Sequence, residues 1–150
     1  LGPAKVKALM LNQISSVVPN CLTICTFPGW SSDDVVKLVR AATGWDVSEY
    51  ELMKVGERAL NLARVFNMRE GLTVEDDRLS ERSYGPTIGG ALADGGIDRE
   101  DLREAVQTYY GMMGWDSETG KPSPWKLAEL DIARLREARL QLPALEHRVL

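Results

Sequence analysis

Residues 48–71 read SEYELMKVGERALNLARVFNMREG, and this run predicts one long helix. Ser48 followed by Glu51 is the capping-box pattern that starts a helix, and Gly71 is a residue type that ends one. Apolar residues recur between them at helical spacing, which predicts a single buried face. We expect this helix to be the spine of the domain and to carry Leu52, Val55, Ala59, Leu62 and Phe66 along one face.

Gly56 lies inside this helix, where glycine costs about 1 kcal/mol relative to alanine. One reading is that a second helix crosses closely at this point, because only glycine leaves room for the approach. The other reading is a tolerated defect. The sequence does not separate the two.

Two further helices are predicted before residue 48. Residues 3–18 show apolar spacing of three and four, with Pro3 suited to the first turn. Ser31 and Asp34 form a second capping-box pattern, and that helix is expected to stop near Gly44. The segment 19–30 between them lacks a sustained period and is expected to be an ordered connection. The expected core residues are Val6, Leu9, Met10, Ile14, Val17 and Val18, followed by Val35, Val36, Leu38, Val39 and Ala42.

After residue 71 the pattern is less regular. Residues 72–97 are rich in glycine and charge and predict a long surface connection. Asp98 caps a helix that ends at Gly114, with an expected apolar stripe, and a short helix runs from Ser123-Pro124 to Leu130. Residues 131–140 are expected to be helical until Pro143. The stripe of the helix after Asp98 is Leu102, Ala105, Val106, Tyr109 and Met113.

No strand pattern or internal repeat competes with these helices. The sequence therefore predicts an all-α fold, an irregular multi-helix domain in which residues 1–150 form a single unit.

Composition excludes several classes of function. The net charge of −4 gives no basic face for nucleic acid, and no apolar run approaches the roughly 20 residues that cross a bilayer. No secretory leader is visible, and only two cysteines occur, which fits a reducing compartment. We expect a cytoplasmic protein with no nucleic-acid or membrane partner.

Candidate catalytic groups are few. The single histidine, His147, lies in the tail with no nucleophile nearby, which favours a solvated residue over a catalytic base. Cys21 and Cys25 are more informative, because thiolates bind soft metals and four residues separate the pair. A tetrahedral zinc or an iron–sulfur cluster takes about four protein ligands. Any cluster bound here must therefore take most of its ligands from elsewhere.

Several stretches together resemble the C-terminal domain of the aldehyde:ferredoxin oxidoreductase family, which includes tungsten-dependent benzoyl-coenzyme A reductase subunits. The resemblance covers nearly the whole chain. None of the matching stretches is catalytic: we expect Arg64, Asn67 and Arg69 to donate to loop carbonyls, and Asp76 and Asp77 to cap or to pair with arginines. The matching stretches are residues 56–58, 61–71, 76–79, 81–82, 109–110 and 114–116, with Leu127 and Leu130 in the final helix.

The functional part of the resemblance is NCLTIC, residues 20–25, which is similar to the family's Asp-x-x-Gly-Leu-Cys stretch. The resemblance implies that Cys25 supplies one ligand of a four-iron four-sulfur cluster, while three cysteines come from an earlier Cys-x-x-Cys-x-x-x-Cys stretch absent here. Asn20 stands where the family has an aspartate that hydrogen-bonds the pterin, and Ile24 where the backbone approaches it. Thr23 replaces glycine, which matters if the backbone must adopt positive φ there. An inert buried thiol is the alternative for Cys25 and the favoured reading for Cys21.

The resemblance implies a C-terminal fragment of a larger enzyme that oxidises an aldehyde to a carboxylic acid and passes electrons through the cluster to ferredoxin. The implied cofactors are tungstopterin or molybdopterin and a 4Fe-4S cluster. They belong to the parent enzyme, and we expect this segment alone to bind none of them. Two alternatives stay open: a subunit of a tungsten-dependent aromatic acyl-coenzyme A reductase, and a metal-free helical interaction module. The expected partners are the remaining domains of the parent enzyme, ferredoxin and a second copy. Such a fragment should expose an apolar patch near Cys25.

Overall fold

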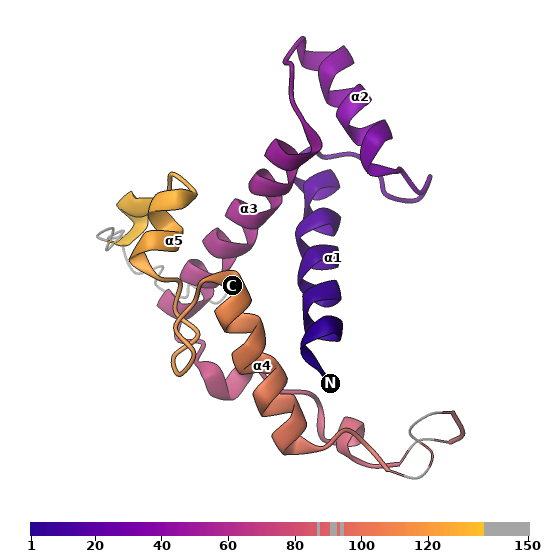
Figure 1. The fold of residues 1–150 in the computed structure, drawn as a ribbon, viewed down its shortest axis with the longest axis vertical. Coiled ribbons are helices and arrows are strands. Elements are labelled where there is room, and N and C mark those ends of the chain that lie inside the picture. The colour runs from indigo at the N-terminus through magenta and orange to yellow at the C-terminus, as the bar shows by residue number, and fades with distance from the viewer. Residues whose placement is uncertain (87, 91–92, 94, 137–150) are drawn as a thin grey trace, which may run out of the picture.

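The computed structural model describes residues 1–86, 88–90, 93 and 95–136, and helices dominate this part of the chain (Figure 1). No strand occurs within the described residues, where Trp115 and Pro122 form an isolated antiparallel bridge. The all-α prediction is confirmed. The elements are α1 (Pro3–Cys21), α2 (Ser32–Thr43), α3 (Glu49–Arg69), α4 (Arg99–Met113) and α5 (Pro124–Glu129), with 3₁₀ turns η1 (Val74–Asp76), η2 (Glu81–Tyr84) and η3 (Ala133–Arg136).

Local capping explains where most helices begin and end. The Ser31 hydroxyl accepts from the Asp34 amide, and the Ser48 hydroxyl accepts from the Glu51 amide, so both predicted capping boxes form. α2 and α4 end on glycines in the left-handed region, Gly44 and Gly114. These predicted boundaries are confirmed because each depends on residues within one turn.

The first helix is longer than predicted. Its end was placed at Val18, but α1 continues through Pro19 to Cys21. A proline in the last turn removes one amide donor, yet the carbonyl of Val18 still accepts from the Leu22 amide at 3.0 Å. Residues 20 and 21 therefore belong to the helix rather than to the connection.

The close-crossing reading of Gly56 is confirmed, and the tolerated-defect reading is wrong. α3 contacts α1, and the two helices lie closest where α1 ends and α3 begins (Figure 1). A Cβ placed on Gly56 would lie 2.2 Å from the carbonyl oxygen of Ile14 and 3.1 Å from a methyl group of Val18. Only a residue without a side chain allows the two backbones to approach this closely.

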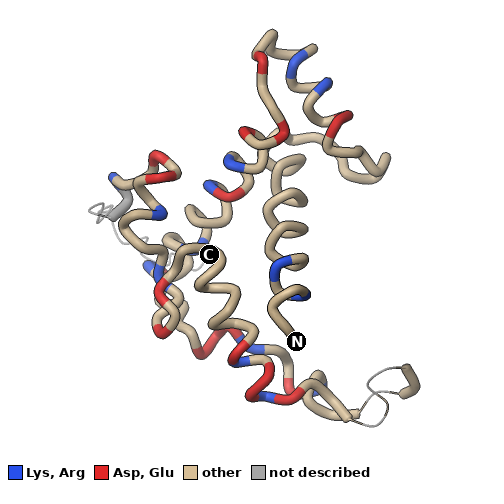
Figure 2. Tube along the Cα trace, in the orientation of Figure 1, with Lys and Arg blue, Asp and Glu red and all other residues tan. Residues whose placement is uncertain are grey.

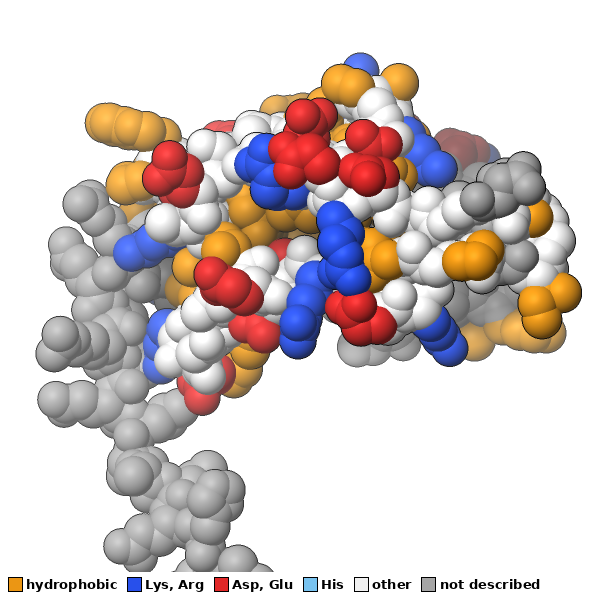
Figure 3. Space-filling model, turned by 90° about the horizontal axis from the view of Figure 1, so that it is seen from below, with side chains coloured by type: hydrophobic (Ala, Val, Ile, Leu, Met, Phe, Trp, Pro, Cys, Tyr) orange, Lys and Arg blue, Asp and Glu red, His pale blue; other side chains and the backbone are white. Residues whose placement is uncertain are grey.

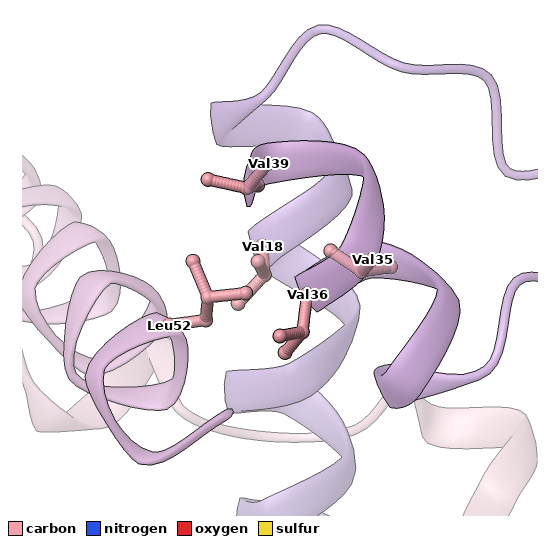
Figure 4. Close-up of a cluster of buried hydrophobic side chains, with 5 residues drawn as sticks. All are labelled: Val18, Val35, Val36, Val39 and Leu52. Atoms are coloured by element: carbon pink, nitrogen blue, oxygen red, sulfur yellow. The ribbon is translucent and has the colours of Figure 1, made fainter. Parts of the chain in front are cut away.

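Buried apolar side chains form two clusters at different ends of α3. The larger one joins the end of α1, the first part of α3 and α2, and its five members point toward one another (Figure 4). Leu22, Ile24 and Val47 pack against it. The smaller cluster lies around α5 and contains Leu127, Leu130 and Ile132, with Val65 of α3 against it. The members of the larger cluster are Val18, Val35, Val36, Val39 and Leu52.

The predicted apolar face of α3 is only partly correct. Leu52 is buried and Val55 and Ala59 are half-buried, but the prediction is wrong for Leu62 and Phe66. Leu62 and Phe66 are exposed, at 39% and 54%, whereas Asn61 and Arg64 are buried at 0% and 7%. The reason is that polar contacts bury this part of α3. The Arg64 side chain donates to the Gly120 carbonyl, and the Asn61 side chain accepts from the Trp115 indole. Hydrophobic spacing alone cannot report a helix face that is buried by polar contacts.

Two other predicted segments also differ. The connection of residues 72–97 contains the short turns η1 and η2, where the sequence showed no period. In the described part of the helix expected over 131–140, the chain forms a 3₁₀ turn over Ala133–Arg136. Residues 137–140, Pro143 and His147 lie outside the described residues.

Candidate functional site

The candidate segment follows α1 in a Schellman motif, the turn that closes many helices. The amide of Ile24 donates to the carbonyl of Pro19 at 3.1 Å, and the amide of Thr23 donates to the carbonyl of Asn20 at 3.1 Å. These are the two bonds that define the motif, and Ile24 makes its usual apolar contact by packing against the cluster that contains Val18. The turn therefore has a fixed shape before any ligand binds.

Thr23 occupies the position of this motif that favours glycine. Its φ is +57°, in the left-handed region, which is unusual for a β-branched residue. The replacement of glycine by threonine was expected to matter if the backbone at residue 23 adopts positive φ. The structure shows that it does. The local backbone is strained at the step that leads to Cys25.

Cys25 is a free, exposed cysteine two residues after this strained position. Its carbonyl oxygen accepts a hydrogen bond of 2.7 Å from the indole nitrogen of Trp30. The expectation that an inert thiol would be buried is therefore wrong for Cys25. The same expectation is wrong for Cys21, which is free and exposed in the last turn of α1.

Asn20, Ile24 and Cys25, the three residues that the resemblance singles out, lie on the same short turn. The Asn20 side chain is exposed and makes no hydrogen bond within the described residues, so its amide is available to a ligand. Ile24 differs, because its side chain is half-buried against the core and only its backbone can face outward. Among the described residues, no three His, Cys, Asp or Glu side chains gather into a metal site. Cys25 can thus provide one thiolate and no more.

Apolar side chains near Cys25 are exposed, as expected. Phe27 is 96% exposed and Trp30 is 41% exposed. Trp30 also lines a small cavity of about 200 Å³ together with Pro19, Val35 and Leu52.

A second feature of the structure is a polar network around Arg64. Its guanidinium donates to the Gly120 carbonyl at 2.9 Å and pairs with the Asp77 carboxylate at 2.7 Å. It also lies over the rings of Tyr110 and Trp115, with centroid distances of 5.4 and 5.1 Å. The predictions that Arg64 donates to a loop carbonyl and that Asp77 pairs with an arginine are confirmed.

The network orders three separate segments of the chain. The Tyr110 hydroxyl donates to Asp77, and burial, together with this hydrogen bond, raises the pKa of Tyr110 to about 12. The Trp115 indole donates to the Asn61 side chain at 2.8 Å. A Cβ on Gly120, whose φ is +62°, would lie 2.2 Å from the Arg64 guanidinium. No sequence pattern predicts the Gly120 contact, because 56 residues separate the partners.

A smaller ionic cluster ties α3 to α5. Lys126 donates to Glu57 at 2.7 Å and to Glu129 at 2.6 Å, and Lys54 contacts the same two carboxylates. Burial lowers the pKa of Lys54, but hydrogen bonds to Glu129 and Glu57 outweigh burial and raise it overall. These four charged side chains pair with one another, and they link α3 to α5.

A cleft of about 500 Å³ lies between α1, α3 and α4. Seen from the end where α1 and α4 begin, hydrophobic side chains lie in a depression bordered by charged ones (Figure 3). Several polar side chains also border the cleft, including Gln13, Asn67 and Tyr109. Burial raises the pKa of Tyr109. Its apolar walls include Val6, Leu9, Leu60, Ala63, Leu102, Ala105 and Val106.

None of the helices within the described residues is both long and apolar enough to cross a membrane.

Comparison with known proteins places these features in context. The model of the family "Aldehyde ferredoxin oxidoreductase, domains 2 & 3" matches residues 1–132. A tungsten-containing aldehyde ferredoxin oxidoreductase of Pyrococcus furiosus is 36% identical over 138 residues, which is 86% of this chain and 21% of the relative. The enzyme of the same name from Thermococcus kodakarensis is 35% identical, over 89% of this chain and 22% of the relative.

A further relative in Pyrococcus furiosus is an aliphatic sulfonate oxidoreductase, WOR-like subunit, at 29% identity over 84% of this chain and 21% of the relative. The chain spans about a fifth of the length of the curated relatives it matches. Because the family model covers most of the chain, and because the predicted helices and turn are present, the chain belongs to the aldehyde ferredoxin oxidoreductase family, within the region of its domains 2 and 3.

Proposed function

We propose that this chain is part of a tungsten-containing oxidoreductase that converts an aldehyde to a carboxylic acid. Cys25 supplies one thiolate ligand to a 4Fe-4S cluster, and Asn20 and the backbone of Ile24 contact the pterin. The remaining domains of the parent enzyme supply the other ligands, and ferredoxin accepts the electrons. When bound, the tungsten pterin would supply the two-electron oxidation chemistry, and the cluster would carry the electrons away one at a time.

The observation that carries this proposal is the rigid turn that presents an exposed, unpaired Cys25. A cluster ligand must be reachable from outside its own segment and must be held in place, and this thiol meets both requirements. The donor set also fits, since one thiolate is what a shared four-ligand cluster would take from this segment.

The chain's own residues contribute positioning rather than chemistry. The Schellman motif sets the direction in which the chain leaves α1, and Ile24 anchors it to the core. The Asn20 amide offers both a donor and an acceptor to a polar heterocycle, although it lacks the negative charge of an aspartate. Leu22 and Ile24 keep water from the inner side of the turn.

Identity favours an aldehyde as the substrate. Four relatives named as tungsten-containing aldehyde ferredoxin oxidoreductases are 33–36% identical, whereas the relative named for aliphatic sulfonates is 29% identical.

The test compares Cys25→Ser with Cys21→Ser in the full-length protein. Both cysteines are free and exposed, and they lie four residues apart, so Cys21 is a matched control. We expect the wild type and Cys21→Ser to contain iron and tungsten and to show the same reduced-cluster EPR spectrum. Cys25→Ser should lose cluster iron or change that spectrum. Equal iron content and equal spectra in both variants would rule out Cys25 as a ligand, and a full-length protein without iron and tungsten would refute the whole proposal.

A further inference from the structure

The hydrogen bond between Trp30 and Cys25 links the candidate ligand to the residue that precedes the N-cap of α2. The indole nitrogen lies 2.7 Å from the carbonyl oxygen of Cys25, and this is the hydrogen bond that the Trp30 side chain makes. The ring of Trp30 lines the small cavity with Val35 of α2 and Leu52 of α3, two members of the larger core cluster. Trp30 therefore restrains the Cys25 carbonyl through this hydrogen bond, in addition to the Schellman motif that precedes it.

This bond also fixes the orientation of one peptide group. The carbonyl of Cys25 and the amide of Thr26 belong to the same planar trans peptide, so they point in opposite directions. Because the carbonyl points at Trp30, the Thr26 amide points away from Trp30. Within the described residues, the amides of Cys25 and Thr26 have no hydrogen-bond acceptor.

Unpaired amides beside a cysteine ligand have a known physical role. Hydrogen bonds to the sulfur atoms of an iron–sulfur cluster are among the factors that set its reduction potential. A residue that fixes the direction of such amides sets how many of them reach sulfur, without touching the cluster itself. Partners of this kind commonly change metal affinity by roughly ten- to a hundredfold when they are removed.

We propose that Trp30 is a positioning residue, which holds the Cys25–Thr26 peptide so that its amide faces the sulfur atoms of the cluster bound at Cys25. This inference rests on the proposed function. It adds a residue with no ligand atom of its own, and it predicts that the tryptophan N–H controls the potential and the retention of the cluster.

The experiment uses the full-length protein with its metals and replaces Trp30 by Phe, which keeps an aromatic ring and removes the N–H donor. Trp45→Phe is the matched control, because Trp45 is 70% exposed and only its backbone amide makes a hydrogen bond. In Trp30→Phe we expect a shifted cluster midpoint potential in an EPR-monitored titration and roughly tenfold faster release of iron to a chelator. Hydrogen exchange of residues 22–30 should also become faster. Trp45→Phe should match the wild type in all three measurements.

If Trp30→Phe lowers the folded fraction, benzothienylalanine at position 30 keeps the ring shape and replaces only the N–H by sulfur, and the same shifts are expected. An unchanged potential and unchanged iron release would overturn the inference, even if hydrogen exchange became faster. Equal shifts in Trp30→Phe and Trp45→Phe would also overturn it. A wild-type protein without a cluster would overturn the proposed function and this inference together, whereas a loaded wild type with an unaffected Trp30 variant would overturn this inference alone.

Discussion

At the scale of single residues, Thr23 is the clearest departure from local preference. A left-handed backbone costs an L-residue about 1–2 kcal/mol, and a β-branched side chain makes the conformation less favourable still. Thr23 adopts φ +57° because the two hydrogen bonds of the Schellman motif and the contact of Ile24 with the core hold it there. The strain is therefore offset by the packing that follows it.

Replacing Thr23 by Gly should stabilise the chain. The gain from relieved strain exceeds the entropy that glycine loses on folding, which leaves about 1 kcal/mol in favour of the variant. Urea denaturation followed by circular dichroism would measure the change in the free energy of unfolding. Thr26→Gly, at an exposed position outside the motif, is the control and should not stabilise the chain. A Thr23→Gly variant that is less stable than wild type would show that the threonine side chain contributes more than its backbone costs.

Tyr110 predicts a dependence of stability on alkaline pH. Burial, followed by the hydrogen bond to Asp77, raises the pKa of Tyr110 to about 12, whereas an unfolded tyrosine titrates near 10. Between these values the unfolded chain binds fewer protons than the folded chain, so stability falls as pH rises. The contribution is fully present below about pH 10 and is lost as pH approaches 12, and it is on the order of 2 kcal/mol.

The folded and unfolded pKa values of Tyr110 set a test range of roughly pH 9.5 to 11.5. In this range the free energy of unfolding should fall more steeply with pH in the wild type than in Tyr110→Phe. Tyr50→Phe is the control, since Tyr50 is 69% exposed, and it should keep the wild-type slope. Identical slopes in wild type and Tyr110→Phe would mean that this hydroxyl does not contribute to the alkaline transition.

The sequence predicted the chemistry of several residues but not their partners. Arg64 was expected to donate to a loop carbonyl and Asp77 to pair with an arginine, and both interactions form. Gly120 and Tyr110 complete the network only because segments distant in the sequence fold together. A local sequence pattern cannot predict such contacts. The role of Trp30 was missed for a similar reason, because a tryptophan before a helix cap has many orientations and only the folded loop selects one.

At the scale of elements, the crossing of α1 and α3 depends on one glycine. Gly56 faces the Ile14 carbonyl at a distance that excludes a methyl group, whereas Gly111 in α4 has nothing within 4 Å of the position of a Cβ. Both residues lie inside helices, where alanine is intrinsically preferred to glycine by about 1 kcal/mol. The two positions therefore separate packing from helix propensity.

Gly56→Ala and Gly111→Ala should change stability in opposite directions. Gly56→Ala forces α1 and α3 apart and should cost about 1–3 kcal/mol, as overpacking in a core does. Gly111→Ala should gain about 0.5–1 kcal/mol from helix propensity. Thermal and urea denaturation of the two variants would test this pair. Stabilisation by both substitutions would contradict the close crossing.

Element boundaries were predictable where the signal lies within one turn, as at Ser31, Ser48, Gly44 and Gly114. The extension of α1 through Pro19 was not predictable from local pattern, because a proline usually marks a helix boundary and here it lies within the last turn, next to the buried Val18.

At the scale of the whole molecule, the chain buries its apolar residues unevenly. The two core clusters occupy different ends of α3, and the cleft of about 500 Å³ lies between α1, α3 and α4. α1 carries charge only near its start, at Lys5 and Lys7, and its next turns expose Leu9 and Leu11 (Figure 2). A surface of this kind is typical of a face that another part of a protein covers. The relatives, of which the chain spans about a fifth, have ample sequence to cover it.

Residues 1–150 expressed alone should therefore bind an apolar dye and self-associate, whereas the full-length protein should do neither through this face. Leu9→Lys would place a charge on the wall of the cleft, and because Leu9 is 51% exposed, the substitution should cost little stability. We expect it to reduce dye fluorescence and to lower the average mass in sedimentation equilibrium. Leu38→Lys is the matched control, since Leu38 is 40% exposed on α2 and does not line the cleft. A monomeric chain without dye binding would mean that the cleft is closed in solution, and equal effects of the two substitutions would mean that association uses a different surface.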